Sequence, residues 1–320
     1  MRAYSPGSSV AVMTTGLVIE THDLVKRFGE RHAIQHVDLR VPEACAFGFL
    51  GPNGAGKTTL IRMLLGLTRA TAGEMRLLGR PVPEQRAEAL ARVGAIVEEP
   101  RFHGHLTGHE NLQTNAAARG GGAAARITGA LERVGLTERA HDRVKTYSMG
   151  MRQRLGIARC LLADPALLIL DEPMNGLDPA GILEFRVLIR SFVDEGRTVF
   201  LSSHLLDEVE RTCDMVAIVD RGRIVRQGGI AEIAGADGSA VVLECDDPAA
   251  ARALLTGLGA VETVGDCDDA LHIVLRPGAD VAELNRALVA AGIGVRRLAP
   301  GRISLEERFL ELTSSIGDDA

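Results

Sequence analysis

Eight consecutive residues form the clearest chemical pattern in this 320-residue chain: Gly51-Pro52-Asn53-Gly54-Ala55-Gly56-Lys57-Thr58. They match G-x-x-x-x-G-K-[ST], follow an apolar run at 46–50 and open a helix predicted over 57–66. Glycines let successive backbone N–H groups turn towards a polyphosphate, and a helix N-terminus adds positive charge. We expect Lys57 to reach the β- and γ-phosphates and the Thr58 hydroxyl to bind Mg²⁺, and we place Thr59 among the phosphate-binding residues. A chance glycine turn is the alternative, but the strand-to-helix context favours a nucleoside triphosphate site.

A pair of acids follows the apolar run Leu167–Leu170, which predicts a buried strand. A carboxylate at the end of such a strand needs a partner, because an unpaired buried charge is costly. Beside a phosphate loop that partner is Mg²⁺, held by Asp171, while Glu172 polarises the attacking water as a general base. The alternative is that both acids simply lie in the following loop. An aspartate alone would leave a kinase, a GTPase and an ATPase open, whereas an aspartate followed by a glutamate favours hydrolysis.

An α/β framework is predicted to position these residues, because strand-like runs alternate with helical segments from residue 17 to about 228. We predict strands at 46–50, 167–170 and 199–202, helices at 57–66, 83–92, 180–195 and 205–211, a loop at 120–125 and a hairpin at 216–225. Glycine and alanine enrichment at 228–238 indicates a boundary. Beyond it, the β-α-β-β-α-β order suggests a small split-βαβ sandwich.

Composition excludes several classes of protein. The net charge of −6 argues against a primary nucleic-acid binder, so no nucleic-acid partner is expected. No uninterrupted apolar run approaches 18 residues, which argues against a bilayer-spanning helix. The five cysteines are odd in number and lack a CxxC pair, which argues against a disulfide framework or zinc site and favours a reducing compartment. The small and polar residues of 1–16 indicate a disordered leader or a wrongly assigned start rather than a signal peptide.

Further motifs lie after the phosphate loop: Tyr147-Ser148-Met149-Gly150-Met151 before the acidic pair, and Gly176-Leu177-Asp178 and His204 after it. Together, in this order, they resemble the motifs of ATP-binding cassette (ABC) ATPases, whose commoner signature is Leu-Ser-Gly-Gly-Gln. The resemblance covers residues 17 to 228. It implies a P-loop NTPase cassette with a RecA-like core, a helical subdomain and an antiparallel β subdomain. We expect this cassette at 17–230 and a small C-terminal accessory α+β domain at 238–313.

The resemblance also implies a head-to-tail dimer with two ATP molecules held between two copies of the chain. In the family, the signature closes on the γ-phosphate bound by the other copy, so Ser148 and Gly150 are implied to contact that nucleotide. Asp178 is implied to communicate across the dimer. Ser148 and Asp178 each also have a simpler interpretation as a helix N-cap. For Ser148 the two roles are compatible.

Three other residues match functional positions of the family. His204 is implied to contact the γ-phosphate and position Glu172, although a lone histidine at such a place is often structural. Phe28 occupies the position where the family stacks a ring on adenine, and ordinary core packing is the alternative. Glu98, or Glu99 if the register shifts by one, replaces a glutamine that approaches Mg²⁺. A carboxylate can still bind a hard cation.

The signature, the acid at 98 and the segment Leu106–Leu112 resemble bacterial drug- and peptide-antibiotic-resistance exporter ATPases of the daunorubicin or bacitracin type. This implies ATP and Mg²⁺ as ligands, a separately encoded membrane permease and a second copy as partners, and a peripheral place at the cytoplasmic face of the cell membrane. Importer ATPases, soluble ABC ATPases acting on ribosomes or DNA, and a non-hydrolysing nucleotide binder are the alternatives. The cargo is not indicated by the sequence.

Overall fold

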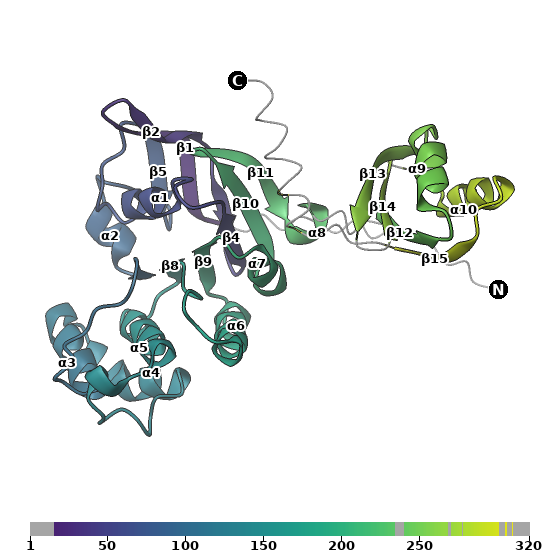
Figure 1. Cartoon of the computed structure of the whole chain (residues 1–320). Helices are drawn as coiled ribbons and strands as arrows, with labels where there is room; N and C mark the ends of the chain where they lie inside the picture. The colour runs from purple at the N-terminus through teal and green to yellow at the C-terminus, as the bar shows by residue number, and fades with distance from the viewer. Residues whose placement is uncertain are drawn as a thin grey trace, which may run out of the picture. The chain divides into compact units, whose positions relative to one another are not determined.

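The computed structural model describes residues 16–233, 240–267, 270–276 and 278–300, together with residues 305 and 309. The chain, drawn in Figure 1, divides into two compact units. The first consists of Met1–Phe47 and Gly56–Ser202, and the second of Gly48–Ala55 and Ser203–Ala320. The leader predicted at 1–16 lies outside the described residues except for its last residue.

An antiparallel sheet is one part of the first unit. Its long strand β1 (Leu17–Phe28) pairs with β2 (Arg31–Val37), β3 (Arg40–Pro42) and β5 (Ala72–Leu77), and β6 (Arg80–Pro81) pairs with β5. The register of β1 shifts against each of its three partners, as at β-bulges. This sheet is the antiparallel β subdomain that the resemblance implies, and it carries Phe28 at the end of β1.

A second set of strands in the first unit carries the acidic pair. Strands β7 (Val93–Ile96), β8 (Leu167–Asp171) and β9 (Thr198–Ser203) are parallel, and β4 (Ala46–Leu50) follows in the order β7-β8-β9-β4. Every residue of β8 is buried, as expected for a parallel strand covered on both faces. The register places Asp171 opposite Ser202, at the ends of their strands.

Helices make up much of the rest of the first unit. They are α1 (Lys57–Leu64), α2 (Arg86–Leu90), α3 (Gly108–Arg119), α4 (Ile127–Arg133), α5 (Met149–Leu161) and α6 (Pro179–Asp194), with 3-10 turns η1 (Ala123–Arg126) and η2 (Val144–Thr146). Helix α3 begins with a capping box, in which Thr107 and Glu110 satisfy each other's backbone N–H groups.

Two of the predicted elements need correction. The helix predicted at 83–92 is confined to α2. The loop predicted at 120–125 is a turn of three glycines with positive φ, followed by η1. The glycines end α3 because they adopt the left-handed region readily, and the alanines after them return to a helical turn.

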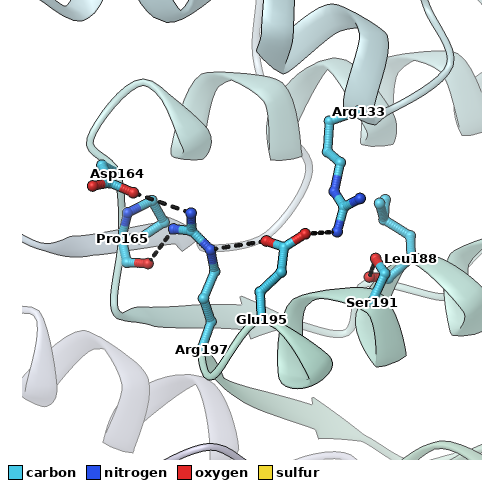
Figure 2. A network of polar contacts seen from close by, with 7 residues as sticks. All are labelled: Arg133, Asp164, Pro165, Leu188, Ser191, Glu195 and Arg197. Carbon is cyan, nitrogen blue, oxygen red and sulfur yellow. Dashed lines mark hydrogen bonds and ion pairs between the residues drawn. The ribbon is translucent and has the colours of Figure 1, made fainter.

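Figure 2 shows an ionic network that joins three segments of the first unit. Glu195, just after α6, forms ion pairs with Arg133 at the end of α4 and with Arg197, whose Nε lies 3.3 Å away. Arg197 also donates to the carbonyl of Pro165 at 2.5 Å and to the carboxylate of Asp164 at 3.1 Å. The guanidinium of Arg197 therefore ties the start of β9 to the loop after α5 and to the end of α6.

The second unit contains the last residues of β4, from Gly48, and the hairpin β10 (Met215–Asp220) and β11 (Arg223–Gly229), in the order β11-β10-β4. Helices α7 (Leu206–Thr212) and α8 (Ile230–Ile233) flank the hairpin in sequence. The hairpin confirms the prediction at 216–225. None of the described helices, in either unit, has the length and apolar character needed to cross a membrane.

The later part of the second unit has the predicted β-α-β-β-α-β order: β12 (Ala240–Cys245), α9 (Pro248–Thr256), β13 (Val261–Cys267), β14 (Ala270–Leu275), α10 (Val281–Ala290) and β15 (Val295–Pro300). The strand order is β13-β14-β12-β15, and neighbouring strands are antiparallel, as in a split-βαβ sandwich. Leu255 of α9 and Leu288 of α10 share one buried cluster with Leu243 and Ile273, so both helices cover the same face of the sheet. After residue 300, the region predicted to end at 313 is described only at residues 305 and 309.

Candidate functional site

The phosphate loop connects β4 to α1 through backbone that only glycine accommodates easily. Gly54 and Gly56 have φ of 85° and 105°. A Cβ on Gly56 would lie 2.4 Å from the carbonyl oxygen of Ala33, and one on Gly51 would lie 2.3 Å from that of Val219. Within the loop, Pro52, Asn53 and Gly54 are exposed, and Ala55 is buried. Left-handed glycines directly before a helix are the geometry in which backbone N–H groups converge on an anion.

Lys57, the first residue of α1, lies beside Glu172. Its Nζ is 3.0 Å from Oε1 of Glu172, and the two side chains are 6% and 20% exposed. The structure thus brings together two of the three predicted catalytic residues, which are 115 positions apart in the sequence. Thr58 and Thr59 follow on the same helix and are partly buried.

Ser202 joins the two acids, and sequence reasoning did not identify it. Its hydroxyl donates to Oδ1 of Asp171 at 2.5 Å and accepts a hydrogen bond from the backbone N–H of Glu172 at 2.9 Å. Glu172 has a φ of 48°, so the chain turns sharply after β8. The signal available in the sequence was a serine at the end of the next predicted strand, but its partner depends on the pairing of β8 with β9.

The donor set near the phosphate loop fits Mg²⁺. Thr58 offers a hydroxyl and Asp171 a buried carboxylate, and hard oxygen donors are those that this cation prefers. Among the residues described, no group of three or more histidine, cysteine, aspartate or glutamate side chains could hold a metal. A site with one carboxylate and one hydroxyl suits a cation whose remaining ligands are water and phosphate oxygens.

The signature segment forms the N-terminus of α5. The exposed Ser148 is its N-cap, and its Oγ accepts from the N–H of Met151 at 3.2 Å. The predicted capping role is therefore confirmed for Ser148. The Cβ position of Gly150 lies 3.6 Å from Leu177, so the signature packs on the loop that leads to α6. In the same way Asp178 caps α6 by accepting from the N–H of Gly181 at 3.0 Å, and it is exposed.

Phe28 is not a core residue, because 51% of it is exposed. The ammonium of Lys26 lies 4.6 Å from the centre of its ring, a cation–π contact on one face. Core packing, the alternative considered from the sequence, is therefore wrong. An exposed ring in a chain with 3% aromatic residues is available for stacking on a base.

The two remaining predicted residues lie at loop positions. Glu98 forms an ion pair with Arg62 of α1 and has a φ of 61°, and Glu99 beside it is exposed. His204 is exposed and follows β9 directly, in the second unit. The carbonyl of Ser203, which precedes it, accepts a hydrogen bond from the N–H of Gly51 at 3.4 Å. Within that unit, the residue before His204 is therefore bonded to the first residue of the phosphate loop.

Known proteins resemble this chain over most of its length. The sequence profile of the family described as "ABC transporter" matches residues 34–175. The uncharacterized ABC transporter ATP-binding protein YhcH of Bacillus subtilis is 39% identical over 94% of this chain and 98% of its own. The bacitracin transport ATP-binding protein BcrA of Bacillus licheniformis is 38% identical over 92% and 97%. The daunorubicin resistance ATP-binding protein DrrA3 of Streptomyces coeruleorubidus is 37% identical over 92% and 94%.

Solved structures share the fold of the nucleotide-binding part. The structure of cbiO1 from Clostridium perfringens, part of the ABC transporter complex cbiONQ, has a TM-score of 0.63 at 25% identity and covers 68% of this chain and 90% of its own. The ATP-binding cassette MJ0796, solved as a dimer bound to ADP and Pi, has a TM-score of 0.60 at 21% identity and covers 66% and 98%.

Proposed function

Because this chain belongs to the ABC transporter family, as one of its ATP-binding and ATP-hydrolysing subunits, we propose that it drives a separate permease that exports a drug, an antibiotic or a peptide. The observation that carries this proposal is the similarity to bacitracin transport ATP-binding proteins, at 36–38% identity over more than 90% of both chains. The aligned segments, of 296 and 307 residues, are longer than the cassette and include most of the C-terminal region. The daunorubicin resistance relative supports the same class of cargo.

In this proposal the acidic pair and the phosphate loop carry the chemistry of hydrolysis. Glu172 takes the proton of the attacking water, and Lys57 neutralises the charge on the β- and γ-phosphates. Thr58 and Asp171, with Glu98 as a further candidate ligand, would hold Mg²⁺, which would supply positive charge to neutralise the phosphates. His204 is assigned a contact with the γ-phosphate. Ser202 supports this set because its single hydroxyl holds Asp171 and the backbone of Glu172 in one arrangement.

ATP binding is proposed to pair two copies head to tail. The exposed tip of α5, with Ser148 and Gly150, then meets the γ-phosphate bound by the phosphate loop of the second copy. The exposed Asp178 lies on the loop that packs against this tip through Leu177, so it suits a contact across the same interface. Phe28 stacks on adenine. The permease holds this pair at the cytoplasmic face of the membrane.

Hydrolysis is tested with the purified full-length chain. We expect ATPase activity that Glu172→Gln abolishes while ATP binding persists, because the amide cannot accept the proton of water. Ser202→Ala keeps both acids but removes the hydroxyl that orders them. Its ATPase activity should therefore lie between that of the parent chain and that of Glu172→Gln. Full activity in Glu172→Gln would contradict the assigned base.

Export is tested by co-purifying the chain with a multispan membrane protein encoded beside it and measuring ATPase activity in vesicles. Bacitracin-like peptides and anthracyclines are the first candidate cargoes, since the relatives carry these names. We expect stimulation of the ATPase and cargo movement out of the compartment that contains the cassette. Movement in the opposite direction would support an importer instead.

A further inference from the structure

Tyr147, directly before the signature serine, is the most buried of the five signature residues 147–151. It is 2% exposed, and its hydroxyl donates a 2.6 Å hydrogen bond to the backbone carbonyl of Arg139. Its own N–H donates to the carbonyl of Val144 at 3.0 Å. Its carbonyl accepts two hydrogen bonds from the guanidinium of Arg152, at 3.2 Å from Nε and 3.1 Å from Nη2. The side chain and both backbone groups of this residue are therefore fixed.

The hydroxyl of Tyr147 also lies against the first residue of α3. A Cβ built on Gly108 would be 2.4 Å from that oxygen and 3.3 Å from the ring carbon that carries it. Only glycine at 108 leaves room for the hydroxyl. The contact is reinforced by the backbone, since Gly108 donates to the carbonyl of Asp142 at 3.2 Å and His109 to that of Ala140 at 2.8 Å. The segment from 139 to 147 is thus bound to the N-terminus of α3 along its length.

The phenol is well suited to this place. Burial raises the pKa of Tyr147 above its usual value, with the charge of Asp142 acting in the same direction, so the hydroxyl stays protonated and remains a donor. The leucine of the commoner signature has no hydroxyl and cannot make this bond. Tyrosine at 147 and glycine at 108 therefore form a matched pair in this chain.

We propose that Tyr147 is a positioning residue, whose hydroxyl, seated between Gly108 and the Arg139 carbonyl, holds Ser148 in the place where it receives the γ-phosphate of the second copy. Ser148 is the next residue along the chain and is itself exposed. Its position is therefore set by Tyr147 on one side and by its own capping bond to Met151 on the other. The proposal rests on the proposed ATP-dependent pairing of two chains.

The test uses the full-length chain in the hydrolysis-blocked Glu172→Gln background. Three variants are compared: Tyr147→Phe, Gly108→Ala and the two combined. Gly129→Ala is the matched control, since a Cβ at that helical position meets nothing within 4 Å. Three quantities are measured for each: ATP-dependent dimerisation by sedimentation, affinity for ADP, and the thermal midpoint. ADP has no γ-phosphate, so it reports on the phosphate loop without Ser148.

We expect Tyr147→Phe to weaken ATP-dependent dimerisation about fivefold, the effect of one lost hydrogen bond, and to leave ADP affinity unchanged. Gly108→Ala should weaken it by more than about tenfold, because the new methyl group displaces the hydroxyl. In the combined variant the 2.4 Å conflict with the hydroxyl is gone and only the tight 3.3 Å approach to the ring carbon remains, so dimerisation should recover most of the way to the level of Tyr147→Phe alone. The Gly129→Ala control should dimerise like its parent.

The proposal is overturned if Tyr147→Phe and Gly108→Ala lower only the thermal midpoint, because the pair would then serve stability alone. It is equally overturned if the combined variant dimerises more weakly than either single variant, by the sum of their two losses. The methyl group at 108 would then not conflict with the hydroxyl of Tyr147. A parent chain that fails to dimerise with ATP would instead refute the head-to-tail pairing on which this inference rests. The two failures are therefore distinguishable.

Discussion

The ion pair between Lys57 and Glu172 leads to a prediction about ATP affinity. Both groups take part in the proposed reaction, yet in the structure they bind each other at 3.0 Å. A triphosphate that engages Lys57 has to compete with this carboxylate. Glu172→Gln keeps the shape of the side chain and removes its charge, so it separates the competition from any change in packing.

The size of the effect follows from the geometry. At 3.0 Å and an effective dielectric of about 20, two unit charges attract by about 5.5 kcal/mol, which is an upper bound. Desolvation of both groups opposes that attraction, and the glutamine oxygen still accepts a hydrogen bond from the ammonium. We therefore expect the free energy of unfolding without nucleotide to fall by about 1–2 kcal/mol, and ATP binding to a single copy to tighten roughly 5- to 30-fold.

The assay is thermal unfolding of the full-length chain with and without ATP, together with calorimetric titration at a protein concentration below that of dimerisation. We expect the variant to be the less stable protein without nucleotide but the one that ATP stabilises more. The variant unfolds earlier than the parent without nucleotide and gains more from ATP than the parent does. Glu184→Gln is the control, because it also removes one carboxylate from an ion pair, here with Arg154. The side chain of Glu184 is 58% exposed, so this pair should contribute little.

The reasoning is refuted if Glu172→Gln binds ATP no more tightly than the parent while hydrolysis is abolished. Equal stability of the two proteins without nucleotide would refute it too, since the ion pair would then contribute nothing. An equal gain in ATP affinity in Glu184→Gln would point to a general effect of net charge.

Three other changes test separate parts of the site and its framework. Glu98→Gln should retain ATPase activity, since an amide stands at this place in the family; loss of ATP binding would show that the acid itself is required. Phe28→Ala should weaken ATP binding about tenfold at an unchanged thermal midpoint, and Phe28→Tyr should preserve binding, as a stacking contact of about 1–2 kcal/mol predicts. Arg197→Ala should lower the free energy of unfolding in urea by about 1–2 kcal/mol, because it removes three hydrogen-bonded partners; a change below about 0.3 kcal/mol would contradict the network of Figure 2.

Local signals in the sequence predicted much of the architecture. The strand at 46–50, the helix that begins at Lys57 and the buried strand that begins at Leu167 are all found where composition and periodicity place them. The split-βαβ order after residue 240 was predicted in the same way. These features depend on residues close together in the chain. The exact length of α2 and the turn η1 were not predicted, because short elements carry few such signals.

The chain order of the motifs was sufficient to indicate nucleotide chemistry, since the loop glycines, the lysine and the acidic pair are read from contiguous residues. Folding alone decided which groups meet. Ser202 binds the acidic pair, the hydroxyl of Tyr147 rests on Gly108, and Arg197 reaches Asp164, across separations of about 30 to 40 residues. Such contacts arise from strand register and helix packing, and each depends on distances that no short stretch of sequence encodes.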